Sequence, residues 1–303
     1  ALVLSALALD LGLFRSRRIE QRELTLRQAA TRTFAWTVLS FLFGVVVLAM
    51  HGQRAALTYV TAYLLEQSLS IDNVFVFLLI FSELRVPPAQ QRGVLMWGVI
   101  GALVMRGLLI AAGLFLLNQF HWVVYPFAAL IIFAAVRLLW GGQKQREAVV
   151  AACGICSSWV ARIIPITPVY HGRRFWAREP ERTGRFVATP LLVALIIIET
   201  TDIVFALDSV PAVLAVTREP FIVYTSNIFA MFGLRSLYFV LAGVVERFRF
   251  LRVGLAAILI FFGARLLLGD FLDVPNGVSL GVIAAALSLA VIASLKWPGT
   301  ATA

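Results

Sequence analysis

The chain has 303 residues, of which 61% are hydrophobic and only 14% are charged, and its formal net charge is +10. A soluble domain of this length could not bury so much apolar surface, which excludes a soluble fold. The basic residues stand in short breaks between apolar stretches rather than in one stripe, so the positive charge does not indicate nucleic-acid binding.

Apolar stretches of about the length of a membrane span follow one another along the chain. They predict an all-α polytopic membrane protein with about nine transmembrane helices. The chain starts inside an apolar stretch, so we expect the first span to be incomplete. The stretches cover residues 1–14, 33–50, 57–82, 94–117, 122–140, 188–216, 221–245, 251–268 and 278–295.

Lysine and arginine are concentrated in every second break. The breaks at 15–32 and 141–187 are rich in them, whereas the break near His51 carries only Arg54 and the one near Asn118 carries none. The positive-inside rule then places the N-terminus in the periplasm and the C-terminus in the cytoplasm. The long break is interpreted as a basic cytoplasmic linker and not as a catalytic domain.

The segments on the two sides of this linker resemble each other. Residues 127–141 match residues 255–269 without a gap, and residues 105–108 match residues 234–237. Each copy holds three spans, and the charge pattern enters the two copies from opposite sides, which predicts a 3+3 inverted-topology repeat. The predicted organisation is 1–56 N-terminal spans, 57–140 first three-helix repeat, 141–187 linker, 188–269 second three-helix repeat and 270–303 C-terminal span.

Carboxylates lie inside the predicted spans, where each costs about 2.5–3.5 kcal/mol on insertion scales. This cost needs compensation from neighbouring groups. An ionisable residue inside the membrane is by default interpreted as functional. Both copies contain the pattern acid-x5-Asp-Asn/Ser, which starts at Glu66 in the first and at Asp202 in the second. The acids are Glu66, Asp72, Glu199, Asp202 and Asp208, and Asp10 lies near a span end.

The spacing of these acids sets a geometric condition. In an unbroken helix Asp202 and Asp208 would be separated by about 120° and about 9 Å. They can converge on one ion only if the helix is interrupted, and Pro211 disfavours helical geometry just before it. With such a break, the matched motifs predict one shared site near the middle of the membrane.

Arginines offer a competing role for the acids, namely ion pairing alone. Arg106 and Arg235 lie deep in spans, so we expect them to pair with some of the acids and to hold the two halves in register. Arg137 and Arg265 lie near span ends and are expected to extend to the interface. Permanent protonation of the acids is a further alternative.

The donor atoms indicate the type of ion. Carboxylates, amide and hydroxyl oxygens suit Mg²⁺, Ca²⁺ or Mn²⁺, and protons remain an alternative. No cysteine lies in a span, which argues against Cu(I) or Zn²⁺, and Cys153 and Cys156 are interpreted as ordinary cytoplasmic thiols. We find no phosphate-binding loop and no nucleophile with its base, so no enzyme and no covalent cofactor is predicted.

Residues 66–77 and 199–212 strongly resemble the TerC family, its Alx-like branch in particular, and residues 221–235 and 170–172 look like further family segments. The resemblance implies a bacterial inner-membrane protein of the lysine-exporter-like superfamily. Alx-type members are associated with manganese export and TerC itself with tellurite resistance. The resemblance implies metal-site roles for Glu66, Asp72, Asn73, Glu199, Asp202, Asp208 and Ser209, with Asp10 and Asn227 as lesser candidates.

We therefore expect a divalent-cation exporter, with Mn²⁺ as the transported ion, that works by alternating access of the two halves. Two alternatives stay open. One is a non-transporting scaffold in a stress, tellurite-resistance or protein-insertion complex, and the other is a proton- or Na⁺-coupled exporter of a small organic cation. The expected partners are the lipid bilayer and the metal ion, without nucleic acid; a homo-oligomer or a stress-complex partner is open.

Overall fold

The structure is a computed structural model that describes residues 26–140, 142–167, 169–170, 172, 174–178, 186–242, 250–269 and 274–296. The first predicted span and Asp10 lie outside the described residues.

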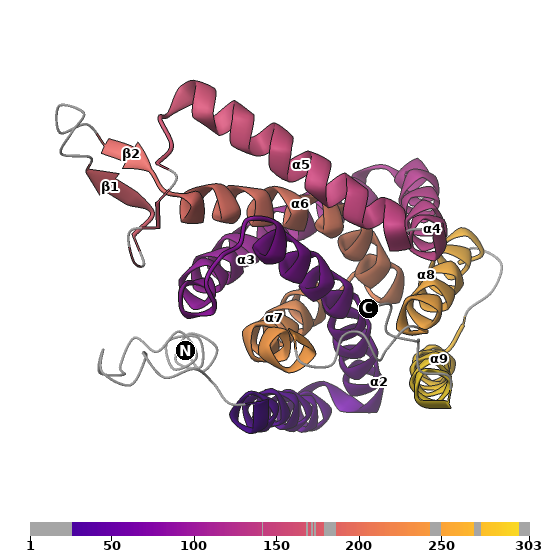
Figure 1. Ribbon diagram of the computed structural model, residues 1–303. Helices are drawn as coiled ribbons and strands as arrows, with labels where there is room; N and C mark the ends of the chain where they lie inside the picture. Colours follow the sequence, from indigo (N-terminus) through magenta and orange to yellow (C-terminus); the bar gives the residue numbers. More distant parts are fainter. Residues whose placement is uncertain are drawn as a thin grey trace.

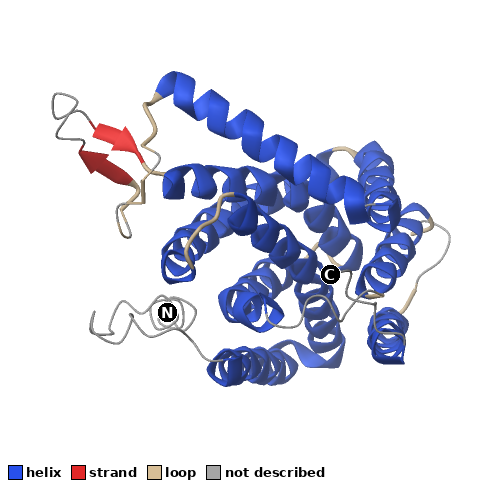
Figure 2. Ribbon diagram, viewed as in Figure 1, coloured by secondary structure: helices blue, strands red, loops and turns tan. Residues whose placement is uncertain are grey.

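Helices form almost all of the described chain, and one short hairpin is the exception (Figure 1, Figure 2). This confirms the predicted all-α class for the bundle. The helices are α2 Leu26–Glu83, α3 Pro88–Gln119, the 3₁₀ turn η1 His121–Val123, α4 Val124–Trp140, α5 Gly142–Ile163, α6 Pro190–Val216, α7 Pro220–Ala242, α8 Leu251–Leu267 and α9 Asn276–Lys296, and the strands are β1 Trp176–Arg178 and β2 Phe186–Ala188.

Five helical stretches of the described chain are long and apolar enough to cross a membrane, or six if the two parts of α7, which meet at 48°, count as one span. The protein is therefore a polytopic membrane protein. Within the described residues, each predicted apolar stretch from residue 33 onward overlaps a helix. With 17 residues, α8 is at the lower limit for a span. The total of nine spans stays a prediction.

Gly52 divides α2 into two helices. Its backbone angles, φ 82° and ψ 177°, are outside the helical region, although the residues on both sides are helical. Positive φ is accessible to glycine because it has no Cβ atom. The bend separates the predicted spans 33–50 and 57–82, so two consecutive apolar stretches become two arms of one element.

The predicted interruption at Pro211 is wrong. Helix α6 runs without a break from Pro190 to Val216, with Pro211 inside it. Proline removes one backbone hydrogen bond, but membrane helices tolerate this where neighbouring groups compensate. Asp202 and Asp208 consequently point in different directions from one continuous helix, and this decides how the acids are distributed.

Contacts between the two halves of the chain occur in matched pairs. Helix α3 packs on α6 as α7 packs on α2, and α4 contacts α6 as α8 contacts α2. The remaining pairs, α4 with α8, α2 with α6 and α3 with α7, join equivalent members of the two halves. This arrangement agrees with a duplicated unit, while the inverted order of the repeat stays a prediction.

The linker between the two halves has regular secondary structure of its own. Helix α5 follows α4 directly and packs on α2 and α6, and the chain then forms the antiparallel hairpin β1–β2, where Trp176 pairs with Ala188 (Figure 1). The Tyr170 hydroxyl donates to the Leu84 carbonyl oxygen at 2.6 Å and ties the linker to the end of α2. The linker is thus folded against the bundle.

Candidate functional site

A buried arginine joins acids from the two halves. Arg106 on α3 is 0% exposed, and its Nη1 donates to Glu66 Oε2 on α2 at 2.8 Å. Its Nε lies 3.4 Å from Asp202 Oδ2 on α6. The predicted pairing of Arg106 with some of the acids is therefore confirmed. The side chain of Arg235 lies outside the described part of the structure.

Two amides complete this network. Asn227 on α7 donates from Nδ2 to Glu66 Oε1 at 2.8 Å, and Asn73 on α2 donates to Asp202 Oδ1 at 3.5 Å. Each acid of the pair is thus held by the arginine and by one amide. We call this set of residues the Arg106 network; it consists of Glu66, Asn73, Arg106, Asp202 and Asn227. Buried charges are tolerated when they are paired and hydrogen-bonded in this way.

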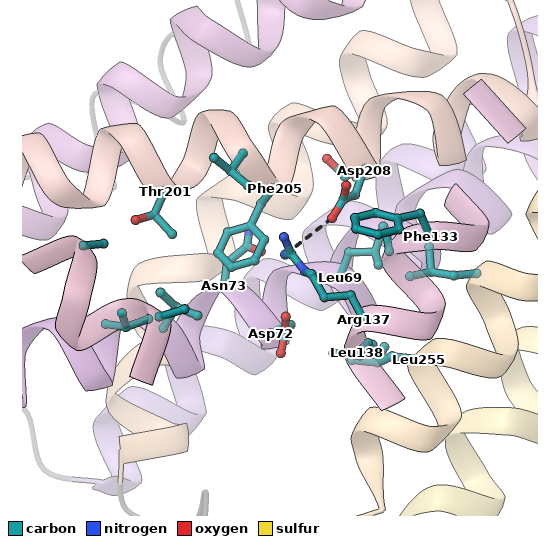
Figure 3. A pocket seen from close by; sticks show the side chains of 18 of the residues that line it. Leu69, Asp72, Asn73, Phe133, Arg137, Leu138, Thr201, Phe205, Asp208 and Leu255 are labelled. Atoms are coloured by element: carbon teal, nitrogen blue, oxygen red, sulfur yellow. Dashed lines mark ion pairs between the residues drawn. The ribbon is translucent and has the colours of Figure 1, made fainter. Parts of the chain in front are cut away.

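A separate pocket of about 550 Å³ lies beside this network. Its wall is mostly apolar and comes from α2, α4, α5, α6 and α8, which meet at the end of the bundle where α4 passes into α5. Figure 3 shows Asp72, Arg137 and Asp208 around a common space between the helices. The polar residues that line the pocket are Asp72, Asn73, Arg137, Thr200, Thr201, Asp208 and Ser209.

Two acids from the two halves face this pocket. Asp72 comes from α2 and Asp208 from α6, and Arg137 Nη2 on α4 lies 3.8 Å from Asp208 Oδ2 (Figure 3). The Ser209 Oγ atom is buried and has no hydrogen-bond partner within the described structure. Because a buried hydroxyl normally has a partner, this atom is available to a ligand or water in the pocket. Asn73 lines the pocket and also belongs to the Arg106 network.

Glu199 occupies a third position. It faces α3, where a Cβ atom added to Gly101 would overlap its carboxyl group, and it is not among the residues that line the pocket. The described residues contain no group of three or more His, Cys, Asp or Glu side chains that could hold a metal ion. The predicted site residues are therefore divided among the Arg106 network, the pocket and the niche at Gly101.

Thr201 and Arg137 line the pocket although sequence reasoning did not select them. Thr201 lies within the acidic motif, between Glu199 and Asp202, and this position in the sequence could have identified it as a site residue. Arg137 was expected to extend to the interface, but the structure places its guanidinium near Asp208, with the side chain 45% exposed. Its nearness to an acid depends on the packing of α4 against α6, which the sequence pattern does not encode.

A second cavity lies at the opposite end of the bundle. It measures about 810 Å³ and is formed at the Gly52 bend, the end of α6 and the starts of α7 and α9. Arg265 lines it and donates to Ser279 Oγ at 2.8 Å and to Asn276 Oδ1 at 3.0 Å. Leu65, Ala206 and Val210 belong to the hydrophobic core of the bundle.

These features define a class: a helical membrane protein with buried, paired acids and an acid-bearing pocket between its two halves. Residues 51–300 match the family described as "Integral membrane protein TerC family". The chain belongs to this TerC family, as its acidic motifs predicted. No solved structure matches it.

Relatives of similar length align along almost the whole chain. An "Uncharacterized membrane protein STKORF319" of Myxococcus xanthus is 44% identical over 97% of this chain and 90% of its own length. A "Putative membrane-bound redox modulator Alx" of Escherichia coli K12 is 40% identical over 93% of this chain and 88% of its own. An "Uncharacterized membrane protein" of Rickettsia bellii is 34% identical over 97% and 94%.

Proposed function

We propose that the protein exports a divalent cation, Mn²⁺ first of all, across the bacterial inner membrane by alternating access of its two halves. One observation carries the proposal: Asp72 and Asp208, one from each half of the chain, face the same pocket inside a bundle of membrane helices. A pocket shared in this way changes its exposure when the halves move against each other, which is how alternating access operates.

The pocket pair, and not the Arg106 network, is the proposed cation site. Glu66 and Asp202 are both held by the guanidinium of Arg106 and by an amide. A cation would have to displace a fully buried arginine, and breaking a buried ion pair costs about 3–5 kcal/mol. We assign this network to holding α2, α3 and α6 together, with Asn73 as its link to the pocket.

The chemistry of the pocket suits a transported hard ion. Mg²⁺-like ions are bound through one or two carboxylates and keep several waters, and carboxylate, hydroxyl and carbonyl oxygens also suit Mn²⁺. Asp72, Asp208 and the unpartnered Ser209 hydroxyl supply such donors. Six water molecules at about 30 Å³ each need roughly 180 Å³, so the pocket of about 550 Å³ has room for a hydrated ion.

The charge pattern of the sequence assigns the two cavities to the two sides of the membrane. The pocket borders α5 in the basic linker, which the positive-inside rule puts in the cytoplasm, and the second cavity then faces the periplasm. In this orientation the pocket can receive a cation from the cytoplasm. Asp10 lies outside the described residues, and no role is proposed for it.

Some relatives are named as redox modulators, but this name does not point to a mechanism through the Cys153 thiol of this chain. Cys153 is buried in α5, and burial, with a smaller contribution from Glu83, raises the pKa of its thiol to about 11. A reactive cysteine needs a lowered pKa because the thiolate is the nucleophile. Metal export would affect redox chemistry indirectly, without any role for this thiol.

Flux through the purified protein tests the proposal. In proteoliposomes that contain only this protein, we expect saturable Mn²⁺ transport, with Mg²⁺ and Ca²⁺ added as competitors to rank the hard cations. Anomalous scattering from Mn²⁺ soaked into crystals should appear between Asp72 and Asp208. Folded protein that neither moves nor binds Mn²⁺ would overturn the proposal and favour a scaffolding role. Inhibition of Mn²⁺ transport by organic cations at low concentration would favour a proton- or Na⁺-coupled exporter of a small organic cation.

A glycine variant tests whether the position of Glu199 matters to this transport. Alanine at Gly101 would collide with the carboxyl end of Glu199, which is flexible and can swing away. We therefore expect Gly101→Ala to fold normally and to lower Mn²⁺ transport several-fold, to the level of Glu199→Gln. Gly107→Ala is the matched control, since no atom lies within 4 Å of an added Cβ there. Full activity of Glu199→Gln would exclude Glu199 from the transport path.

A further inference from the structure

Two arginines meet the buried acids in different ways. Arg106 is 0% exposed and donates a 2.8 Å hydrogen bond to Glu66, within the normal range for such bonds. Arg137 lies 3.8 Å from Asp208, too far for a hydrogen bond, and 45% of its side chain is exposed. The first guanidinium is locked by its partners, whereas the second is attracted by charge and can move.

The pocket has room for this movement. Its volume of about 550 Å³ exceeds the roughly 180 Å³ of a cation with six waters, so a guanidinium and a hydrated ion fit side by side. Arg137, Asp72 and Asp208 all line it, and Figure 3 shows the guanidinium directed at the Asp208 carboxylate. A cation that binds between the acids needs the Asp208 carboxylate, which Arg137 already contacts, so the cation and the guanidinium compete for this carboxylate.

We propose that Arg137 is a displaceable counter-ion of the cation site. When the pocket holds no cation, the guanidinium partly neutralises Asp208, so the empty carrier does not return with the full negative charge of this carboxylate. When Mn²⁺ binds, the like charge repels the guanidinium toward solvent. When the ion leaves, Arg137 returns to Asp208 and hinders rebinding. The inference rests on the proposed function and adds a positioning residue to it.

The matching arginine of the second half supports this assignment. Arg265, which the repeat equates with Arg137, lines the cavity at the other end of the bundle and donates to the oxygens of Ser279 and Asn276. The two arginines thus occupy different surroundings in one and the same conformation. Two inverted halves that exchange their conformations require such an asymmetry at any one moment.

Transport kinetics of Arg137→Gln provide the test. Removal of a positive charge beside Asp208 should tighten Mn²⁺ binding and lower KM about tenfold, as expected for a partly exposed charge. Return of the empty carrier should become slower, so kcat should fall about tenfold as well. Arg137→Lys, which keeps the charge, should restore most of kcat. A purely structural role predicts the opposite for KM, which would stay unchanged or rise.

The control is Arg162→Gln, which removes an exposed arginine of α5 outside the pocket. This variant should leave both KM and kcat of Mn²⁺ transport unchanged. Equilibrium Mn²⁺ binding, followed by electron paramagnetic resonance, separates the two proposals. If the wild-type protein transports Mn²⁺ and Arg137→Gln neither tightens binding nor slows turnover, the counter-ion role fails alone. If the wild-type protein neither binds nor transports Mn²⁺, both proposals fail.

Discussion

Arg106→Gln is expected to abolish most of the folded protein in the membrane. The substitution leaves Glu66 and Asp202 buried, 1% exposed each, without the guanidinium that both acids share. Removing one partner of a buried ion pair costs about 3–5 kcal/mol, which is a large part of the stability of a typical protein. The amount of monodisperse protein after mild detergent extraction, together with its thermal unfolding temperature, measures the loss.

Neutralising the acids at the same time provides the control. The triple variant Arg106→Met, Glu66→Gln, Asp202→Asn removes all three charges and keeps side chains of similar size. We expect it to recover most of the folded protein, because replacing a buried ion pair by uncharged groups is often neutral or stabilising. Wild-type stability of Arg106→Gln alone would contradict the role assigned to the network.

Several features of this fold were accessible from the sequence because they follow from the bilayer itself. A helix is the only way for an apolar stretch of this kind to satisfy its backbone in lipid, so the spans could be located. A deep arginine needs an acid because an unpaired charge inside the membrane is costly, which is why the pairing of Arg106 was predictable. The family followed from the two acidic motifs, and residues 51–300 match it.

The distribution of the acids was not accessible, because it depends on continuity and rotation of single helices. A break at Pro211 would have turned Asp208 toward Asp202; the continuous α6 instead directs Asp202 to Arg106 and Asp208 to the pocket. The bend at Gly52 and the hairpin β1–β2 were missed as well. A single glycine is compatible with many conformations, and strands of three residues carry no readable alternation.

The continuous helix also changes what the repeated motif means. Its first acid, Glu66 or Asp202, belongs to the Arg106 network, and its second acid, Asp72 or Asp208, faces the pocket. One motif therefore supplies a carboxylate paired with Arg106 and a carboxylate that faces the pocket in each half, and the second is the proposed cation ligand. This division accounts for four of the five acids in the spans, and the fifth, Glu199, lies against Gly101.

Asp208→Asn and Asp72→Asn are each expected to lower Mn²⁺ export by about two orders of magnitude, because affinity for hard cations depends steeply on the number of charged ligands. Both variants should remain folded, since asparagine has nearly the same shape and no charge to bury. Mn²⁺ efflux from loaded cells and flux in proteoliposomes measure the effect. The matched control is Glu83→Gln, an exposed carboxylate at the end of α2 outside the pocket.

The double variant distinguishes one shared site from two independent ones. If Asp72 and Asp208 bind the same ion, either single change already destroys the site, and the double variant should be little worse than the singles. If each acid binds its own ion, the losses should multiply. Normal export by either single variant would remove that acid from the site and leave the pocket without the pair on which the proposed transport depends.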